Sequence, residues 1–447
     1  METDLMEKIL SLAKRRGFVF PGSEIYGGLQ NSWDFGPLGA ELKRNIKAAW
    51  WDRFIRRRPG MVGLDASILM NTKVWEASGH LKKFSDPLVE CSKCHKRFRG
   101  DRIKIEKGCP ECGGELGEAR QFNMMLQTRL GATEDKASEV YLRPETAQGI
   151  FVNFKNIMDT ERMSLPFGVG QIGKAFRNEI TPGNFIFRTR EFEQMEIEYF
   201  IPIPKKDDDW NGYFEEWRKE MLEWMAYLGI DVKRQIRELE VPEGERAHYS
   251  KRTVDFEYAF PFGEDELYGL AYRGDFDLKN HGEASGADLK YKDPVSGEEF
   301  YPHVIEPTFG VERSVLAAMC SAYTEEEAPT GEKGETETRT VMKFPKWLAP
   351  VKAAVLPLSK KEELSSVAKD LTDDLRKDLV VDYDETQSIG KRYRRQDEIG
   401  TPYCITVDFD SLEDKKATVR DRDTMKQERV AIPEIKSYLL ERFKDNT

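Results

Sequence analysis

The spacing of hydrophobic side chains predicts two long amphipathic helices in the first half of the chain. Leu38, Leu42, Ile46, Ala49, Trp50 and Phe54 recur at steps of three and four residues, and Pro59-Gly60 marks an end. A second stripe predicts a helix over 210–228, stopped by Gly229, and is formed by Phe214, Trp217, Met221, Trp224 and Leu228. We interpret this aromatic stripe as core packing rather than as a ligand site, because large aromatic residues are mostly buried.

Short apolar runs separated by Gly and Pro predict the strands of a sheet over 121–200, 254–278 and 300–305. Residues 17–39 are rich in Gly and aromatic residues and predict a loop region. Residues 324–340 are acidic, rich in Thr, Gly and Pro, and almost free of apolar side chains. Such a composition is typical of a flexible excursion or linker, and we expect one or the other there.

Beyond this segment, strands and helices alternate. The apolar pattern predicts strands at 353–356, 380–381, 403–407 and 417–420, with helices at 364–375 and 432–443. Such alternation over about 100 residues indicates a self-contained α/β domain. We place its start near Phe344.

Composition limits the class of protein. With 447 residues, 39% of them hydrophobic, the chain is long enough for two to four folded domains and too apolar to be disordered. No apolar run approaches the ~20 residues of a membrane span and no signal-peptide core follows Met1, so we expect a cytoplasmic, unprocessed protein. The net charge of -11 gives no overall attraction to nucleic acid. Any such partner would need the local basic clusters 56–58 or 391–395, each of which could equally be a solvated surface.

Four of the six cysteines predict a structural zinc site. Cys91 and Cys94 form one C-x2-C pair, Cys109 and Cys112 form another, and fourteen residues separate the pairs. Four thiolates on two facing turns complete a tetrahedral zinc shell with no open position for chemistry, so the adjacent His95 is not needed. The alternatives are two disulfides or free thiols, which the sparse cysteine usage does not favour.

Three charged segments interrupt strand-like sequence: 143–146, 176–198 and 304–313. In the second, Arg177 and Glu179 would share one strand face, and Arg188, Phe192 and Glu196 would share a face of the returning strand after a loop with Pro182-Gly183. A single pair of this kind could be an ordinary cross-strand salt bridge. Together they indicate a cleft, since unpaired burial of so many charges is costly. Arginines with an aromatic face suit a nucleoside triphosphate, although the sequence has no Walker loop and no Gly-x-Gly-x-x-Gly after a strand.

The second and third of these charged segments resemble motifs of a known family. Phe-Arg-x-Glu, a loop and Arg-x3-Phe-x3-Glu resemble motif 2 of the class II aminoacyl-tRNA synthetases, and residues 310–313 resemble the end of their motif 3. The strings at 20–28, 33–39, 143–149 and 304–308 are similar to those of glycyl-tRNA synthetases of the single-chain, homodimeric type. The resemblance spans nearly the whole chain. It implies an α+β catalytic domain on an antiparallel sheet with a zinc-ribbon-like insert, followed by an α/β anticodon-binding domain with a mixed sheet.

The resemblance also implies an activity and its residues. ATP and glycine would form glycyl-adenylate with release of pyrophosphate, and glycine would then pass to tRNA(Gly) with release of AMP. Arg177, Arg313 and Glu306 would be the catalytic residues, with no protein nucleophile. The implied ATP-binding residues are Arg177, Asn178, Glu179, Phe187, Arg188, Phe192, Glu266, Leu267, Gly310 and Arg313.

Glycine and metal ions complete the implied site. Glycine would lie among Arg99, Glu145, Glu196, Arg273, Glu306 and Thr308, where crowded carboxylates leave no room for a larger amino acid. Thr308 departs from the serine usual in the family and adds a methyl group to this pocket. Glu266 and Glu306 are candidate Mg²⁺ ligands beside ATP, and Zn²⁺ would occupy the four cysteines.

The implied organisation has two domains and a tRNA surface. Residues 1–343 would form the catalytic domain, with a zinc-binding insert at 86–120 and a helical insertion at 201–250, and residues 344–447 the anticodon-binding domain. Lys391, Arg392, Arg394 and Arg395 would contact tRNA, and the helix from Leu38 would lie at a homodimer seam. Two alternatives stay open: a threonine, proline or serine synthetase of the same subclass, and a non-catalytic tRNA-binding relative. The intact arginines and carboxylates argue against the second alternative.

Overall fold

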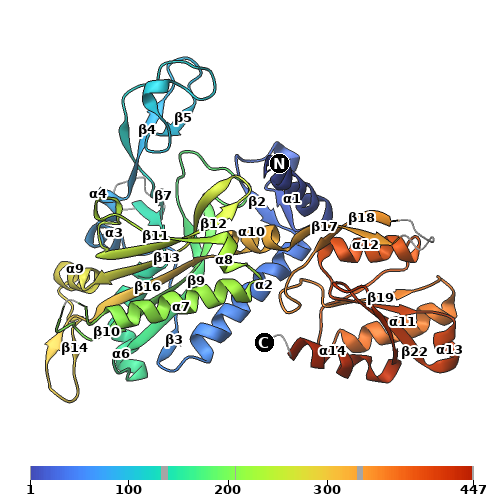
Figure 1. Ribbon diagram of the computed structural model, residues 1–447. Helices are drawn as coiled ribbons and strands as arrows, with labels where there is room; N and C mark the ends of the chain where they lie inside the picture. The colour runs from blue at the N-terminus through green and yellow to red at the C-terminus, as the bar shows by residue number, and fades with distance from the viewer. Residues whose placement is uncertain (1, 132–138, 207, 330–335, 445–447) are drawn as a thin grey trace.

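The N-terminal part of the protein is built on a seven-stranded sheet. The computed structural model describes residues 2–131, 139–206, 208–329 and 336–444 (Figure 1). The strand order is β11-β12-β13-β16-β10-β9-β3, and every neighbouring pair is antiparallel except β3 with β9. The antiparallel sheet expected from the resemblance is therefore confirmed. Its strands are β3 (Met61–Gly63), β9 (Phe167–Phe176), β10 (Glu191–Ile201), β11 (Ile236–Glu240), β12 (Arg252–Phe260), β13 (Gly263–Gly274) and β16 (His303–Gly310).

Three helices cover one face of this sheet: α2 (Pro37–Trp51), α7 (Asn211–Tyr227) and α10 (Val311–Ala322). Pro37 occupies the first turn of α2, where a missing N–H costs nothing. Phe54 packs against Trp50 and against Trp217 and Trp224 of α7, with ring centroids 5.7 to 5.9 Å apart. Both helices predicted from the apolar stripes are confirmed, although the end of the first continues as a π-helical turn, Asp52–Arg56.

The other face of the sheet is polar at its centre. Along β10, Gln194, Glu196 and Glu198 alternate with the core residues Met195 and Ile197, as the two-residue period of a strand requires. Helices α5 (Ala147–Val152), α6 (Phe154–Glu161) and α9 (Phe276–Ser285) pack beside this face. The prediction of strands alone over 121–200 and 254–278 was thus wrong for α5, α6 and the start of α9. Short buried helices read as apolar runs, which periodicity alone does not distinguish from strands.

A small sheet projects away from the main body and carries the cysteines (Figure 1). It consists of β4 (Ser85–Glu90), β5 (Arg97–Arg99) and β6 (Arg120–Asn123), all paired antiparallel. The remaining helices of this part are α1 (Glu2–Arg16), α3 (Thr72–Ala77), α4 (His80–Lys83) and α8 (Val232–Gln235). The remaining strands are β1 (Val19–Pro21), β2 (Trp33–Phe35), β7 (Leu126–Arg129), β8 (Glu139–Leu142), β14 (Tyr291–Lys292) and β15 (Glu299–Phe300). The predicted loop region 17–39 thus includes the short β1–β2 pair.

The C-terminal part is a three-layer α/β domain with a five-stranded mixed sheet. The order is β20-β19-β21-β22-β23, with β19 parallel to both β20 and β21 and the other pairs antiparallel. Helices α11 and α14 pack on one face of the sheet and α12 on the other. The predicted strands and helices are all present, whereas α12, α13 and β23 had not been predicted. The elements are β19 (Ala353–Pro357), α11 (Glu362–Leu375), β20 (Val381–Tyr383), α12 (Ile389–Ile399), β21 (Tyr403–Val407), α13 (Asp410–Asp414), β22 (Lys416–Asp421), β23 (Gln427–Ala431) and α14 (Ile435–Lys444).

In its described residues, the segment between the two parts forms a pair of strands and not the flexible excursion or linker that its composition predicted. Strand β17 (Tyr323–Pro329) continues directly from α10 and pairs antiparallel with β18 (Thr336–Met342); residues 330–335 of the predicted linker lie outside the described residues. Arg339 of β18 is buried and pairs with Asp397 of α12 at 3.0 Å. The prediction failed because the partner that orders this polar hairpin is a charge 58 residues away.

Candidate active site

One cavity gathers most of the residues predicted to bind ATP. Nine of the ten lie around it, from the end of β9, the loop before β10, and the facing ends of β13, β16 and α10. The tenth, Asn178, donates its main-chain N–H to Met124 O at 2.8 Å. Arg177 and Arg188 lie just outside the strands on which the sequence placed them, because β9 ends at Phe176 and β10 begins at Glu191. The lining residues are Arg177, Glu179, Ile186, Phe187, Arg188, Thr189, Phe192, Gln194, Glu266, Leu267, Tyr268, Thr308, Gly310, Glu312 and Arg313.

Three arginines make this cavity suitable for an anion. The Arg177 guanidinium lies between the rings of Phe84 and Phe192, 5.4 and 5.3 Å from their centroids, and its Nε donates to Pro144 O at 3.0 Å. Arg313 packs over Phe187 and donates to the main-chain oxygen of Glu266 at 2.7 Å. Burial lowers the pKa of Arg188, whose ion-pair partner Asp265 is 4.0 Å away. Fixed guanidinium forks match phosphate oxygens.

A second, smaller group of residues adjoins the cavity: the buried carboxyls of Glu145, Glu196 and Glu306. Glu196 lies opposite Thr308 in the β10–β16 ladder, so it is next to the cavity wall. Thr146 binds Glu196 through both its main-chain N–H, at 2.8 Å, and its hydroxyl. The structure thus brings together the three carboxyls predicted to surround the substrate ammonium and sets them against Thr308.

These carboxyls do not share one protonation state. Burial opposes the ionisation of Glu145, but His80 and Arg273 outweigh it and lower the pKa of Glu145. Burial, followed by the charge of Glu145, raises the pKa of Glu196. Burial raises the pKa of Glu306 to about 8 even though Arg273 counteracts it, and it raises the pKa of Glu198 well above its ordinary value. Both carboxyl oxygens of Glu198 are buried without a hydrogen bond. The group as a whole favours a bound cation.

The two arginines predicted to bind glycine already have carboxylate partners. Arg273 is fully buried, donates to both oxygens of Asp277 at 2.8 Å and binds Glu306 at 2.6 Å. Arg99 pairs with Asp86 at 2.8 Å and with Asp101 at 2.7 Å. Its ion-pair partners in the described part of the chain are thus residues of the insert rather than Glu145, Glu196 or Glu306.

Sequence reasoning missed several residues of this region. His80 lies 3.3 Å from Glu145, and the Gln148 amide bonds Glu145 and Asp277. Gln148 belongs to the string 143–149 that carried the resemblance, so a signal for it existed. His80 offered none, because it lies 65 residues away from its partner in a polar segment. Asp255, on β12, was missed as well; burial and the neighbouring Glu266 raise its pKa to about 8.

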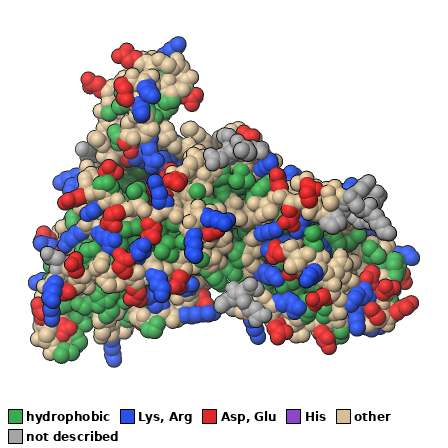
Figure 2. Space-filling model, in the orientation of Figure 1, with side chains coloured by type: hydrophobic (Ala, Val, Ile, Leu, Met, Phe, Trp, Pro, Cys, Tyr) green, Lys and Arg blue, Asp and Glu red, His purple; other side chains and the backbone are tan. Residues whose placement is uncertain are grey.

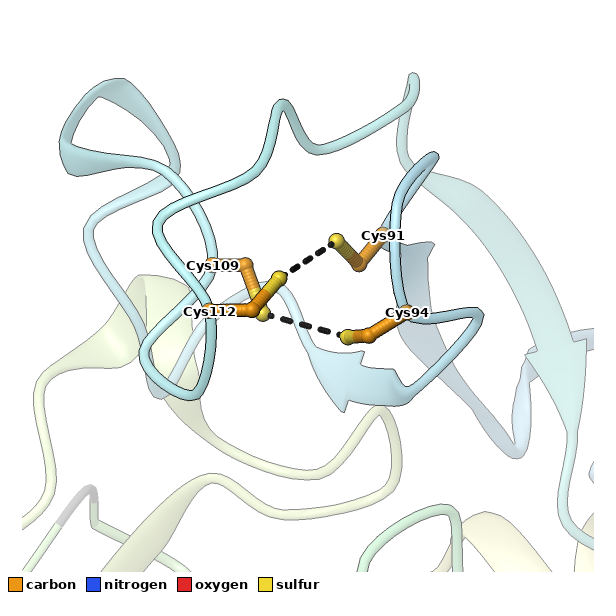
Figure 3. Close-up of side chains that lie close together, drawn as sticks. All are labelled: Cys91, Cys94, Cys109 and Cys112. Carbon is orange, nitrogen blue, oxygen red and sulfur yellow. Dashed lines mark hydrogen bonds between the residues drawn. The ribbon is translucent and has the colours of Figure 1, made fainter.

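The four predicted zinc ligands converge at the tip of the insert (Figure 3). Their sulfur atoms all lie within 4.8 Å of one another, with Cys91 to Cys112 at 3.5 Å and Cys94 to Cys109 at 3.6 Å. These distances exceed the ~2.05 Å of a disulfide and approach the ~3.8 Å edge of a tetrahedron with Zn–S bonds of ~2.3 Å. Main-chain N–H groups lower the pKa of Cys91 to about 6, which favours a thiolate there, whereas at Cys94 the Lys96 N–H is outweighed by burial and the neighbouring thiols, which raise the pKa of Cys94 to about 12. The arrangement therefore fits the ion.

The basic cluster of the C-terminal part divides into exposed and buried members. Lys391 is exposed at the start of α12 and lines a small hollow with Arg16, Arg394 and Arg395. Arg392 instead is buried, and its guanidinium donates to the main-chain oxygens of Pro357 and Asp384 at 2.6 and 3.0 Å. Arg392 therefore stabilises the domain from inside, and its burial contradicts its predicted place on the tRNA surface. Elsewhere, acidic and basic side chains are interspersed over the face shown in Figure 2.

Comparisons with known proteins agree with this architecture. The model of the tRNA synthetase class II core domain (G, H, P, S and T) matches residues 130–323, and that of an anticodon binding domain matches residues 352–442. Glycine–tRNA ligase of Alkaliphilus oremlandii is 53% identical, over 98% of both chains. Those of Bacillus cereus and Staphylococcus saprophyticus are also 53% identical, covering 97% and 98% of this chain and 98% and 99% of their own.

The chain belongs to the glycine–tRNA ligase family. Its class II core and anticodon-binding domain are those of the fold class predicted from the sequence. Enzymes with this core use ATP and Mg²⁺. Within the described residues, the helices of this family member are too short or too polar to cross a lipid bilayer.

Proposed function

We propose that this protein attaches glycine to tRNA through a glycyl-adenylate intermediate, with the adenylate formed between the arginine-lined cavity and the buried carboxyls. The observation that carries this proposal is their adjacency: Glu196 and Thr308 face each other across two paired strands at the border of the two sites. Pyrophosphate exchange with glycine, alanine, serine, threonine and proline tests it. We expect exchange with glycine alone; exchange with another of these amino acids would favour another synthetase of the subclass.

ATP would lie in the cavity with its adenine near Glu179 and Phe192 and its phosphates toward the arginines. Arg177 would contact the α-phosphate, and Arg188 and Arg313 the β- and γ-phosphates. Their role is to stabilise negative charge that grows on the phosphates as the glycine carboxylate attacks in line. Because that carboxylate is itself the nucleophile, the protein needs only to orient it and neutralise charge.

Mg²⁺ would neutralise charge on the phosphates when bound beside them. The donor chemistry fits, since Glu266 presents a carboxylate to the cavity and Mg²⁺ prefers oxygen ligands. Burial opposes the ionisation of Glu266, but Arg313 outweighs it and lowers the pKa of Glu266. Glu306 binds Arg273 and is not among the residues that line the cavity, so we assign it to glycine and keep Glu266 as the Mg²⁺ ligand.

Glycine would place its ammonium group among Glu145, Glu196 and Glu306, with Thr308 closing the space that a Cβ atom would need. Arg273 would act chiefly by orienting Glu306, because both of its edges are already bonded to carboxylates. Arg99 would have to exchange its bond to Asp86 or Asp101 to reach the substrate carboxylate.

The Michaelis constant for glycine is expected to fall as pH rises. Part of the Glu306 population is protonated below about pH 8 in the empty site, and an ammonium group favours the ionised form, so glycine binding releases a proton. Between about pH 6.5 and 8.5 we expect a threefold to tenfold decrease in the KM for glycine in pyrophosphate exchange. The KM for ATP, measured over the same range, is the control. A flat glycine profile would show that Glu306 is already ionised.

We propose a tRNA surface on α12 formed by Lys391, Arg394 and Arg395, together with Arg16 of α1. Lys391→Glu is expected to raise the KM for tRNA about tenfold at low salt, because phosphate contacts by exposed cations dominate such binding. Pyrophosphate exchange, which needs no tRNA, should not change. Lys377→Glu makes the same charge change just after α11, on the opposite face of the domain sheet, and should leave charging intact. Equal effects of both variants would remove α12 from the proposed surface.

Zinc is proposed to hold the insert together, with no part in the reaction. We expect one zinc ion per chain by atomic absorption, and we expect Cys109→Ala to abolish it and to speed amide hydrogen exchange across 85–123. Cys320→Ala removes another buried thiol, outside the cluster, and should keep the metal. Full zinc content in Cys109→Ala would contradict the four-thiolate site.

We also propose a homodimer in the cytoplasm. Ile25, Tyr26 and Leu29 expose between 67 and 89% of their surface in the segment before α2, an unusual cost for three neighbouring apolar residues unless a second subunit covers them. This seam lies ahead of α2, whose own apolar stripe is buried within the chain. Sedimentation of the full chain decides between a dimer and a monomer. All six cysteines are free thiols, which suits a reducing compartment.

A further inference from the structure

A buried polar network lies behind the carboxyls to which we assign glycine. It joins Glu145 to Asp277 through the side chain of Gln148, in the first turn of α5. The Gln148 Nε2 donates to Glu145 Oε1 at 2.9 Å and to Asp277 Oδ1 at 3.0 Å, and all three residues are buried. The interpretation rests on the proposed placement of glycine.

The chemistry of the network fixes the orientation of the amide. Two carboxylate acceptors on one nitrogen require both of its N–H donors, so the NH₂ group must face Glu145 and Asp277. On the other side, His281 Nε2 lies 2.7 Å from Gln148 Oε1 and donates to it. Burial lowers the pKa of His281, which keeps the ring neutral with a single N–H to donate. The two carboxylates exclude the flipped amide, in which an oxygen would face both of them, and His281 supports the resulting orientation by donating from Nε2 to Gln148 Oε1.

The same network reaches the second substrate carboxyl. Asp277 accepts two hydrogen bonds from Arg273, and Arg273 binds Glu306. Glu145 and Glu306, which lie on different elements of the chain, are thus tied by hydrogen bonds through Gln148, Asp277 and Arg273, in addition to the longer 3.9 Å ion pair between Arg273 and Glu145. Two carboxyls that repel each other keep a fixed separation only if both are anchored, and a pocket for the smallest amino acid depends on that separation.

We propose that Gln148, oriented by His281, is a positioning residue that holds Glu145 and Glu306 at the spacing required for glycine. Gln148 does not contact ATP, since it is absent from the lining of the nucleotide cavity. Its loss should therefore weaken glycine binding and selectivity while sparing the nucleotide site.

The test compares Gln148→Met with Gln171→Met in glycine-dependent pyrophosphate exchange. Gln171 is a matched control: it is equally buried and lies on β9 beside α5, opposite Glu196 in the strand ladder, but its side chain bonds the Ala66 N–H at 2.8 Å and no substrate carboxyl. We expect Gln148→Met to raise the KM for glycine by about tenfold to a hundredfold, with the KM for ATP within twofold of wild type. Alanine-dependent exchange should rise relative to glycine. Gln171→Met should change neither Michaelis constant by more than about twofold.

A second pair of variants keeps the proposal testable if Gln148→Met fails to fold. His281→Gln retains an N–H donor where His281→Phe has none, so we expect the glycine KM to rise in the second and to stay near wild type in the first. Unchanged glycine KM in both Gln148→Met and His281→Phe overturns the proposal, as do equal rises in His281→Gln and His281→Phe. The variant Glu145→Gln separates the proposed placement of glycine from the proposed positioning role of Gln148. If it leaves the glycine KM unchanged, the placement of glycine is wrong; if it raises the KM while the network variants do not, the positioning role alone is wrong.

Discussion

Replacing Arg177 with alanine is expected to lower glycine-dependent pyrophosphate exchange by about a thousandfold. The reaction develops negative charge on the phosphates, and Arg177 is held in place for that charge by Pro144 O and by two aromatic rings. Its side chain supports the fold through the hydrogen bond to Pro144 O and the two ring contacts, so the loss of stability should be only about 1–2 kcal/mol. The variant should remain folded and inactive.

The control for this experiment is Arg237→Ala. Arg237 lies on β11 of the same sheet and pairs on the surface with Glu257, away from the cavity. The Arg237→Ala variant should keep full activity in pyrophosphate exchange. A thermal transition near that of the wild type, with near-normal exchange in Arg177→Ala, would remove Arg177 from the proposed contact with ATP.

Arg339→Met is expected to destabilise the protein by about 3 kcal/mol. Its guanidinium is fully buried and bonds Asp397, Glu326 and the main-chain oxygen of Arg422. Methionine fills a similar volume without the charge, so Asp397 would stay buried with weaker compensation. Arg420 still contacts Asp397 at 2.9 Å, which limits the loss.

Urea unfolding followed by fluorescence measures this effect as a shift in the first transition, since a two-part protein need not unfold in one step. Arg394→Met is the matched control. It also removes an arginine that pairs with Asp397, at 3.4 Å, but its side chain is partly exposed, so we expect a loss of about 0–1 kcal/mol. Equal shifts in the two variants would mean that burial of Arg339 adds nothing to the joint between the two parts.

The sequence predicted the elements whose information is local. The stripes on α2 and α7 follow the helical period, and the strands of the C-terminal domain are short apolar runs flanked by polar residues. The zinc cluster could equally be predicted from the sequence, because the two ligands of each pair are separated by only two residues. The hairpin β17–β18 was misread because its order depends on Arg339 meeting a distant charge, which no local composition shows.

The site could be predicted only where motifs carried it. Arg177, Arg188 and Phe192 lie within one continuous stretch of sequence, so their convergence followed from a strand, a loop and a strand. The bonds between Gln148, Asp277 and His281 join residues about 130 positions apart, and only the folded chain shows them. Likewise, nothing in the cluster 391–395 indicated that Arg392 points inward while Lys391 remains in water.

The direct continuation of α10 into β17 has a mechanical consequence. One uninterrupted stretch runs from Glu306 through Arg313 to the hairpin that clasps α12, without an intervening loop before residue 329. A hinge has no place along it. If the C-terminal domain moves when tRNA binds, the β17–β18 hairpin can move with it, and α10 then tilts as well. Otherwise the domain slides along the hairpin, which breaks the ion pair between Arg339 and Asp397.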